Sequence, residues 1–317
     1  MDVILHNNLH APISVAVMES GKHCYCEKPM AGSYVDAVAM KEAAARTGMK
    51  LHIQLARLYG AATECAKKFI DTGRLGKVYH SRSYGYRRRG RPFVDGYAVK
   101  EFNQQVWAGH GALYDMGVYH VSQLLYLLGT PKVARVSGSF YQELAMERRE
   151  ESGFDVEELA VGLIKFEDGS TLDIIESWAI HGGEFPSSSI HGSEGGLRFE
   201  GYSNDSITYY SEIEGYPAVS TLNLKSENYR KTQINPDRWM MQGSQAHWVG
   251  ILRGEVEPID TVHVALQTML VSEGIFLSHT LGREVTGDEI PALCKSNAMK
   301  NQETPFGILK YKEYPFV

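Results

Sequence analysis

The chain has 317 residues, of which 43% are hydrophobic and 22% charged, and its formal net charge is −6. This length accommodates one large or two medium domains, and two is the expected number. The acidic balance gives no broad attraction to nucleic acid or to an anionic membrane, so we expect a small-molecule substrate and neither of those partners.

The first 58 residues predict a parallel α/β domain. A short apolar run predicts a strand at 3–5, and apolar residues at helical spacing predict a helix over 11–20. Ser33 is expected to cap a second helix that ends at Thr47, and a further strand is expected at 50–55. Strands that alternate with helices indicate parallel pairing.

After residue 58 the pattern changes to that of an α+β domain, expected over 59–317. A helix over 61–71 and a strand over 77–86 lead to a polar, aromatic loop over 87–109, and a helix follows over 118–128.

A series of strands separated by turns comes next, at 133–139, 158–166, 171–177, 187–191 and 196–199. Because no helices lie between them, they imply a large, mostly antiparallel open sheet. Two late helices, 240–253 and 261–280, would cover one face of this sheet. The tail over 287–317 is expected to be mostly irregular.

Several classes of site are not expected. The four cysteines lack the spacing of a disulfide framework or a zinc site, so we expect reduced thiols, and the histidines show no ligand spacing that predicts a metal. The basic run over 87–91 is expected to be solvated or paired with carboxylates. No stretch of about 18 apolar residues predicts a membrane span, and the start lacks a secretory signal, so the cytoplasm is the expected compartment.

The most informative motif is Glu27-Lys28-Pro29, at the end of a short apolar run. Open α/β sheets bind ligands beyond the carboxyl ends of their strands. Pro29 has no N–H and biases Lys28 away from helix, so we expect the strand to end there with the lysine at the rim. The motif therefore predicts one wall of an active site.

A second motif, over 109–120, places Asp115, Tyr119 and His120 around the start of a helix. Its glycines allow close approach of a ligand, and a helix N-terminus stabilises the Asp115 anion. A helix cap, a core aromatic ring and a satisfied buried histidine would give the same pattern. The motif alone leaves both interpretations open.

Together the two motifs resemble the glucose-fructose oxidoreductase, inositol dehydrogenase and MocA (Gfo/Idh/MocA) family of nicotinamide-dependent dehydrogenases. The resemblance extends to the segments 7–12, 250–254 and 282–285, and thus covers almost the whole chain. It implies a Rossmann domain followed by an α+β domain whose open sheet presents the substrate site and often packs against another subunit. We therefore expect a homo-oligomer, a dimer or a tetramer, formed through the open sheet.

The resemblance implies that Lys28 handles the substrate hydroxyl proton and that Asp115 and Tyr119 complete the site, with His120 as the alternative to Tyr119. Adjacent helical residues point about a quarter-turn apart, so only one of these two can easily face the substrate. Burial and the cationic nicotinamide would lower the pKa of Lys28, which suits a base. The candidate cofactor residues are Asn7, Asn8, His10, Glu27, Lys28, Gln54 and Arg57. The candidate substrate residues are Arg91, Tyr97, Asp115, His120 and Trp178.

One departure from the family concerns the cofactor. A Rossmann dinucleotide site usually carries Gly-x-Gly-x-x-Gly after its first strand, and this sequence has no such motif. The first strand resembles the family's fourth, so we expect a truncated Rossmann-like sheet. Three explanations stay open: a start internal to a longer protein, a natural short form without a freely exchanging dinucleotide, or a non-catalytic scaffold or binding protein.

These observations predict an oxidoreductase that transfers a hydride between NAD or NADP and a secondary hydroxyl of a sugar, glycoside or cyclitol. One alternative is a lyase or glycosidase that forms a transient keto sugar with tightly held NAD. The other is a non-catalytic homologue that acts in sugar binding or assembly.

Overall fold

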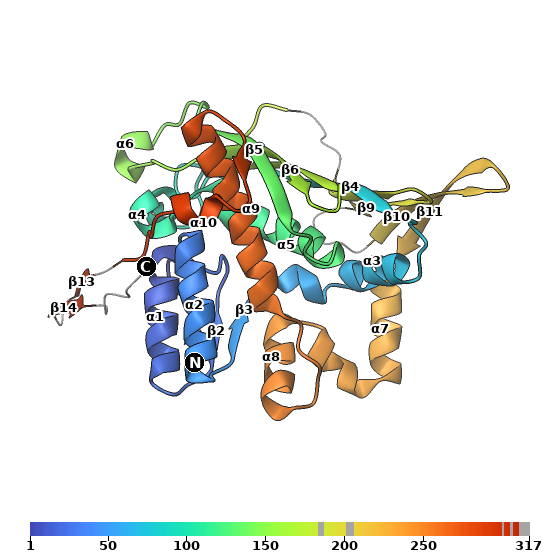
Figure 1. Ribbon diagram of the computed structural model, residues 1–317, viewed down its shortest axis with the longest axis horizontal. Coiled ribbons are helices and arrows are strands. Elements are labelled where there is room, and N and C mark those ends of the chain that lie inside the picture. The colour runs from blue at the N-terminus through green and yellow to red at the C-terminus, as the bar shows by residue number, and fades with distance from the viewer. Residues whose placement is uncertain (183–186, 201–205, 300, 305–306, 311–317) are drawn as a thin grey trace.

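The computed structural model describes residues 1–182, 187–200, 206–299, 301–304 and 307–310. A small parallel sheet and a large, mostly antiparallel sheet are surrounded by helices (Figure 1), which confirms the predicted fold class. None of the helices within these ranges is long and apolar enough to cross a membrane.

The small sheet has three parallel strands, in the spatial order β1 (Asp2–Val3), β2 (Cys24–Cys26) and β3 (Leu51–Ile53). Helices α1 (Asn7–Glu19) and α2 (Tyr34–Thr47) connect them. All side chains of the central strand β2 are buried, as expected for a parallel strand covered on both faces. The three carboxyl ends meet at one edge of the sheet.

Helix α2 begins and ends as the sequence predicts. The Ser33 Oγ accepts a hydrogen bond from the Asp36 N–H at 3.3 Å, and Gly48 closes the helix with φ +69°. A serine cap and a left-handed glycine are standard solutions for the unpaired backbone groups at helix ends.

Helix α1 begins at Asn7 rather than Ala11, so residues 7–10 are helical and not a loop. The prediction missed this turn because residues 7, 8 and 10 are polar, although buried, and so add nothing to the apolar helical spacing that marked the helix. Pro12 lies inside α1 and has no N–H for the Asn8 carbonyl. This carbonyl accepts a hydrogen bond from the Met299 N–H at 3.0 Å instead.

The large sheet has nine strands in the order β11-β10-β9-β8-β4-β7-β6-β5-β12. Neighbouring strands are antiparallel, except that β4 and β7 are parallel. The strands that correspond to predicted ones are β4 (Val78–Tyr86), β5 (Val133–Tyr141), β6 (Leu159–Phe166), β7 (Thr171–Ser177), β8 (Ser189–Gly192) and β9 (Gly196–Glu200).

The prediction missed three strands of this sheet. β10 (Ser206–Ile213) and β11 (Tyr216–Asn223) form a hairpin that projects from one end of the molecule (Figure 1), and β12 (Val285–Thr286) pairs with β5. Most residues of β11 are exposed, so the strand has no buried face to give an alternating hydrophobic pattern.

The tail is more regular than expected. It contains the short helix α10 (Ile290–Leu293) and a second hairpin, formed by β13 (Asn301–Thr304) and β14 (Gly307–Lys310). Of the two preceding helices, α9 (Thr261–Leu281) matches its predicted range, whereas α8 (Ser244–Arg253) begins later than expected.

Helices cover both sheets. The long helix α9 packs against β5, and α5 (Val118–Leu127) packs against α9 and β4. Helix α3 (Ala61–Asp71) follows its predicted range, whereas α7 (Lys225–Ile234) was not predicted. Helix α8 packs on the small sheet through Trp248 and Ile251, which contact Tyr25 of β2.

Candidate active site

Lys28 is the second residue after β2, at the carboxyl edge of the small sheet. Its Nζ donates hydrogen bonds to the main-chain oxygen of Asp115 at 2.7 Å and to the Asp115 Oδ1 at 2.9 Å. The side chain of Lys28 is 12% exposed. The peptide bond between Lys28 and Pro29 is cis. The two sequence motifs, 87 residues apart in the chain, therefore meet at one point.

Asp115 lies in a π-helical turn, η3 (Leu113–Gly117), which runs directly into α5. Asp115 is thus inside a helical segment. The interpretation of Asp115 as a helix cap is therefore wrong. Its Oδ2 accepts a hydrogen bond from the Trp178 Nε1 at 3.0 Å. Trp178 is fully buried and follows β7. Each carboxylate oxygen of Asp115 therefore has its own donor.

The charges of Lys28 and Asp115 stabilise each other. Burial would lower the pKa of Lys28, but the Asp115 carboxylate and the Tyr119 phenol outweigh it, and the pKa is raised. Burial would raise the pKa of Asp115, but Lys28, the Trp178 hydrogen bond and the charge of Arg87 lower it. The predicted lowering of the Lys28 pKa is therefore wrong, because that prediction took no account of a carboxylate 2.9 Å away.

Tyr119 and His120 point in different directions from the first turn of α5. The Lys28 Nζ lies 4.6 Å from the centroid of the Tyr119 ring. The His120 Nδ1 lies 3.0 Å from each carboxylate oxygen of Glu176, a fully buried residue that also accepts a hydrogen bond from the Ser83 Oγ at 2.8 Å. Tyr119 is thus placed at Lys28, and His120 is held against β7.

Two candidate cofactor residues on α1 bind backbone groups of the protein. The Asn7 amide donates to the Ala108 carbonyl at 2.8 Å. The Asn8 amide donates to the carbonyls of Gln105 and Val106 at 2.9 and 2.8 Å. These bonds attach α1 to the short helix α4 (Gln105–Ala108), close to the segment that carries Asp115.

His10, the third candidate on α1, is fully buried. Its Nδ1 lies 2.7 Å from the Pro29 carbonyl and its Nε2 lies 3.0 Å from the Leu5 carbonyl. Burial lowers the pKa of His10 to about 4, so the ring is neutral at neutral pH. The ring therefore links α1 to the segment that follows Lys28.

Three further cofactor candidates lie beyond β2 and β3. The Oε2 of half-buried Glu27 accepts a hydrogen bond from the Lys28 N–H at 3.2 Å. Gln54 follows β3, and its Oε1 is buried without a hydrogen-bond partner among the described residues. Arg57 lies one turn further on, in η1 (Ala56–Tyr59). Glu27, Lys28 and Gln54 thus share the carboxyl edge of the sheet.

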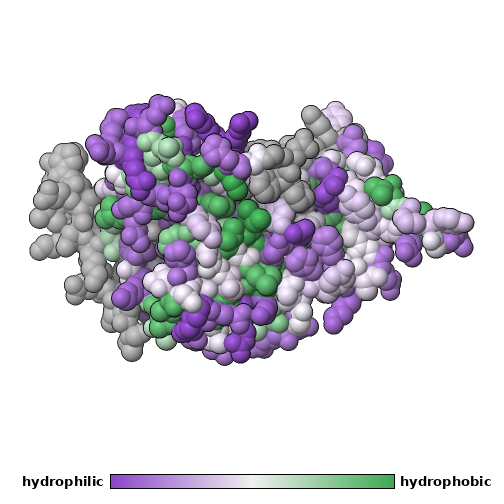
Figure 2. Space-filling view, turned by 90° about the horizontal axis from the view of Figure 1, so that it is seen from above, coloured by the Kyte–Doolittle hydropathy of each residue, from purple (hydrophilic) through white to green (hydrophobic). Residues whose placement is uncertain are grey.

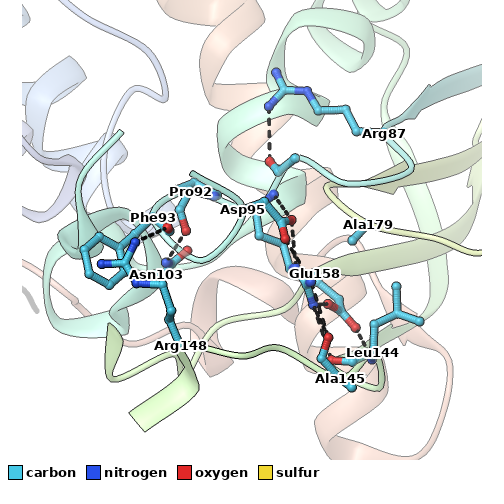
Figure 3. A network of polar contacts seen from close by, with 12 residues as sticks. Arg87, Pro92, Phe93, Asp95, Asn103, Leu144, Ala145, Arg148, Glu158 and Ala179 are labelled. Atoms are coloured by element: carbon cyan, nitrogen blue, oxygen red, sulfur yellow. Dashed lines mark hydrogen bonds and ion pairs between the residues drawn. The ribbon is translucent and has the colours of Figure 1, made fainter. Parts of the chain in front are cut away.

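The structure separates the candidate substrate residues. Arg91 is buried, and its guanidinium is bound by Asp95 at 2.9 and 3.0 Å and by Glu158 at 3.0 Å. This is the carboxylate pairing that the sequence predicted for the basic run. Figure 3 shows Asp95 and Glu158 within a larger network of polar contacts. Tyr97 is 39% exposed, and its hydroxyl accepts a hydrogen bond from the Arg87 Nη1 at 2.7 Å.

Tyr97 also lies within electrostatic range of the Lys28 site. Burial raises the pKa of Tyr97 to about 12, Arg87 opposes this shift, and Asp115 adds to it. Arg87 in turn lowers the pKa of Asp115. Tyr97 and Arg87 are therefore neighbours of the site, while Arg91 supports the loop that carries them.

The sequence prediction missed four buried glutamates, Glu157, Glu158, Glu176 and Glu273. Burial raises the pKa of Glu157 to about 7, although the N–H groups of Gly111 and Leu113 oppose the shift. The adjacent pair Glu157-Glu158 at the start of an apolar strand was a usable signal, because ionisable groups entering a core need partners. Among the residues that the structure describes, no group of three potential ligands could hold a metal ion.

Two family models match the chain. Residues 1–55 match the oxidoreductase family with an NAD-binding Rossmann fold, and residues 63–198 match the GFO/IDH/MocA C-terminal domain. The chain belongs to the Gfo/Idh/MocA family. Lys28 lies within the first of these two ranges and Asp115 within the second.

Curated members of the Gfo/Idh/MocA family are related over part of their length. The chain is 26% identical over 182 residues to D-glucoside 3-dehydrogenase of Escherichia coli (strain K12), covering 55% of this chain and 50% of that protein. It is 25% identical over 220 residues to levoglucosan dehydrogenase of Pseudarthrobacter phenanthrenivorans, covering 63% of this chain and 54% of that protein. The chain thus spans about half the length of these relatives.

A solved structure of levoglucosan dehydrogenase in complex with NADH and L-sorbose has the same fold. The two structures superpose with a TM-score of 0.73 at 22% identity, over 91% of this chain and 80% of the other. This similarity establishes the fold of the Gfo/Idh/MocA family for the chain.

Proposed function

We propose that this chain forms the hydride-transfer site of an NAD(P)-dependent dehydrogenase that acts on a secondary hydroxyl of a sugar, glycoside or cyclitol. The observation that carries the proposal is the Lys28–Asp115 pair at the carboxyl edge of the small sheet, with Tyr119 and Trp178 beside it. Relatives named as dehydrogenases of a glucoside and of levoglucosan support the substrate class.

In this proposal, a bound nicotinamide would supply the acceptor or donor of the hydride. The raised pKa of Lys28 keeps its Nζ charged at neutral pH, so Lys28 donates a hydrogen bond to the substrate oxygen and a proton when a carbonyl is reduced. In alcohol oxidation the hydroxyl proton passes to neutral Lys28. Asp115 holds Nζ in place and sets its pKa, and the Tyr119 ring shields it from one side.

The residues at this edge fit the nicotinamide end of a dinucleotide. The buried Gln54 Oε1 has no described partner and can accept a hydrogen bond from a carboxamide N–H. Glu27 and Lys28 lie at the adjacent strand end. Because Asn7 and Asn8 already bind backbone carbonyls, we assign them to shaping this edge. The proposal covers both NAD and NADP.

The proposal is tested with the purified chain, NAD⁺ or NADP⁺, and a panel of glucosides, levoglucosan and inositols. We expect reduced nicotinamide to form with at least one substrate, and Lys28→Met to abolish its formation. Calorimetry with each nicotinamide nucleotide gives a second measurement. The absence of both binding and turnover would contradict the proposal and favour a non-catalytic role.

We also propose that two or more copies associate through the open face of the large sheet. Along β7, buried Leu172, Ile174 and Glu176 alternate with partly exposed Asp173 and Ile175, so the described residues cover the face turned away from α5 and α9 only in part. From above, the molecular surface shows a patch of hydrophobic residues near its middle, among hydrophilic ones (Figure 2).

Light scattering of the purified chain tests this association. We expect a dimer or tetramer, and Ile175→Glu should shift it toward the monomer, because a charge would be buried in the contact. A monomer at micromolar concentration would contradict the assignment.

A further inference from the structure

Two consecutive glutamates, Glu157 and Glu158, lie buried immediately before β6, with exposures of 3% and 2%. Neither residue contacts Lys28 in the structure. The two carboxylates bind different neighbours. Both sets of neighbours lead to Asp115.

Glu157 binds the segment that precedes Asp115. Its Oε2 accepts a hydrogen bond from the Gly111 N–H at 2.7 Å, and its Oε1 accepts one from the Leu113 N–H at 3.0 Å. Its main-chain oxygen accepts a third from the Ala112 N–H at 3.2 Å. A Cβ at position 111 would lie 2.0 Å from that oxygen, so Gly111 permits the close approach. Three consecutive backbone donors are therefore fixed by one residue.

Glu158 binds the segment that carries the other partner of Asp115. Its main-chain oxygen accepts a hydrogen bond from the Trp178 N–H at 2.8 Å, and the Trp178 indole donates to the Asp115 Oδ2. Its carboxylate accepts hydrogen bonds from the Glu143 and Leu144 N–H groups at 2.8 and 2.6 Å. Glu158 is thus anchored by its side chain and holds Trp178 by its backbone.

Arg91 neutralises the buried charge of Glu158. Its Nη1 lies 3.0 Å from the Glu158 Oε2, and it also donates to the carbonyls of Leu144 and Ala145 at 3.3 and 3.4 Å (Figure 3). Asp95 binds the same guanidinium on its other side. A buried charge pair with this many hydrogen bonds holds one geometry, since each donor or acceptor would be costly to leave unpaired.

We propose that Glu157 and Glu158 are positioning residues that fix the Asp115 carboxylate from two sides, so that its Oδ1 faces Lys28 while its Oδ2 is held by Trp178. The proposal rests on the proposed hydride-transfer function and assigns the glutamates no contact with substrate. Loss of the hold on Trp178 weakens the hydrogen bond that helps to keep the Asp115 pKa low.

Glu157→Gln and Glu158→Gln test the proposal, with Glu150→Gln, at an exposed position, as the matched control. We expect kcat to fall at least about tenfold in both variants while KM changes less than about threefold, because orientation and not substrate binding is lost. The acid limb of the kcat profile should move to higher pH in Glu158→Gln, and Trp178→Phe should reproduce this shift. The control should behave as the unmodified chain.

A measurement that does not need turnover separates this proposal from the proposed function. The Lys28 amine is titrated by NMR in the chain labelled with ¹³C-lysine, and circular dichroism checks that each variant is folded. We expect the Lys28 titration to shift in both glutamate variants. Folded variants with unchanged Lys28 titration would overturn the positioning role. An inactive chain with a shifted titration would instead contradict the hydride-transfer function alone.

Discussion

The Nζ of Lys28 and the Oδ1 of Asp115 are 2.9 Å apart, and each belongs to a different sheet region: Lys28 follows a strand of the small sheet, and Asp115 lies next to the large one. Their pairing fixes the two regions at the site. It also keeps both residues ionised, since each shifts the pKa of the other toward the charged form.

Removing the lysine should abolish activity and weaken the fold. Lys28→Met is expected to lower kcat by about 10²- to 10⁴-fold, the usual contribution of a positioned proton donor or acceptor. It also leaves the Asp115 carboxylate unpaired in a largely buried site, which should cost on the order of 2 kcal/mol of unfolding free energy. Urea unfolding and steady-state kinetics check both, and Lys41→Met, at an exposed helical lysine, is the control.

Removing the carboxylate should shift the alkaline limb of the reaction. In Asp115→Asn the charge that raises the Lys28 pKa is lost and burial lowers it, so Lys28 becomes neutral at lower pH. The alkaline limb for carbonyl reduction, which needs protonated Lys28, should therefore move to lower pH, with a lower maximum rate. A pH profile that keeps its alkaline limb would show that Lys28 is not the titrating group.

Substitutions at the two adjacent ring residues of α5 should have different effects. Tyr119→Phe keeps the ring beside the Lys28 Nζ but removes the hydroxyl, so kcat should fall about tenfold with little change in thermal stability. His120→Asn takes a partner from the buried Glu176 carboxylate, so the unfolding free energy should fall by about 1–3 kcal/mol. The melting temperature should fall with it. Differential scanning calorimetry and kinetics of both variants distinguish the two roles. An unchanged melting temperature in His120→Asn would contradict the structural part of this prediction.

The buried rings of Tyr25, His52 and Trp248, between α8 and the small sheet, should make the fold acid-sensitive. Burial lowers the pKa of His52 from 6.5 to about 3, where its Nε2 lies 3.1 Å from the Ser244 Oγ. The fold favours neutral His52, because its pKa is lower in the folded chain than in the unfolded chain. The stability that depends on the neutral ring is therefore present above pH 6.5 and is lost as the pH falls toward 3.

The expected loss is about 1.4 kcal/mol for each pH unit below 6.5. The His52→Gln variant has no titrating side chain at this position. Its unfolding free energy should therefore fall less between pH 6.5 and 5.5 than that of the unmodified chain. Urea unfolding at both pH values measures the difference. Equal slopes in the two chains would show that His52 does not control the acid sensitivity.

The sequence allowed the fold class, most strands of the large sheet and the pairing of the two motifs to be predicted. These follow from local signals: the serine cap at Ser33, the apolar runs, and the residues at the ends of strands. The hairpin β10–β11 was missed because its exposed strands carry no alternation, and the first turn of α1 was missed because its polar side chains bind carbonyls distant in sequence.

Within the site, the two motifs and their resemblance to the family predicted that Lys28, Asp115 and Tyr119 act together. The three side chains do lie together. The burial of Arg91 in an ion-pair network and the direction of the Lys28 pKa depend on three-dimensional distances, which spacing does not contain. The choice of proton-transfer group between Tyr119 and His120 stays a prediction for kinetics.

The bond between the Met299 N–H and the Asn8 carbonyl, which Pro12 leaves unpaired within α1, has a consequence for biosynthesis. It joins the first helix of the chain to one of its last described segments, and such a contact between distant residues forms late because a long loop must close. Until residue 299 has left the exit tunnel of the ribosome, the amino end of α1 lacks this partner. We therefore expect the small sheet to reach its final, protease-resistant state only after residue 299 has left the exit tunnel.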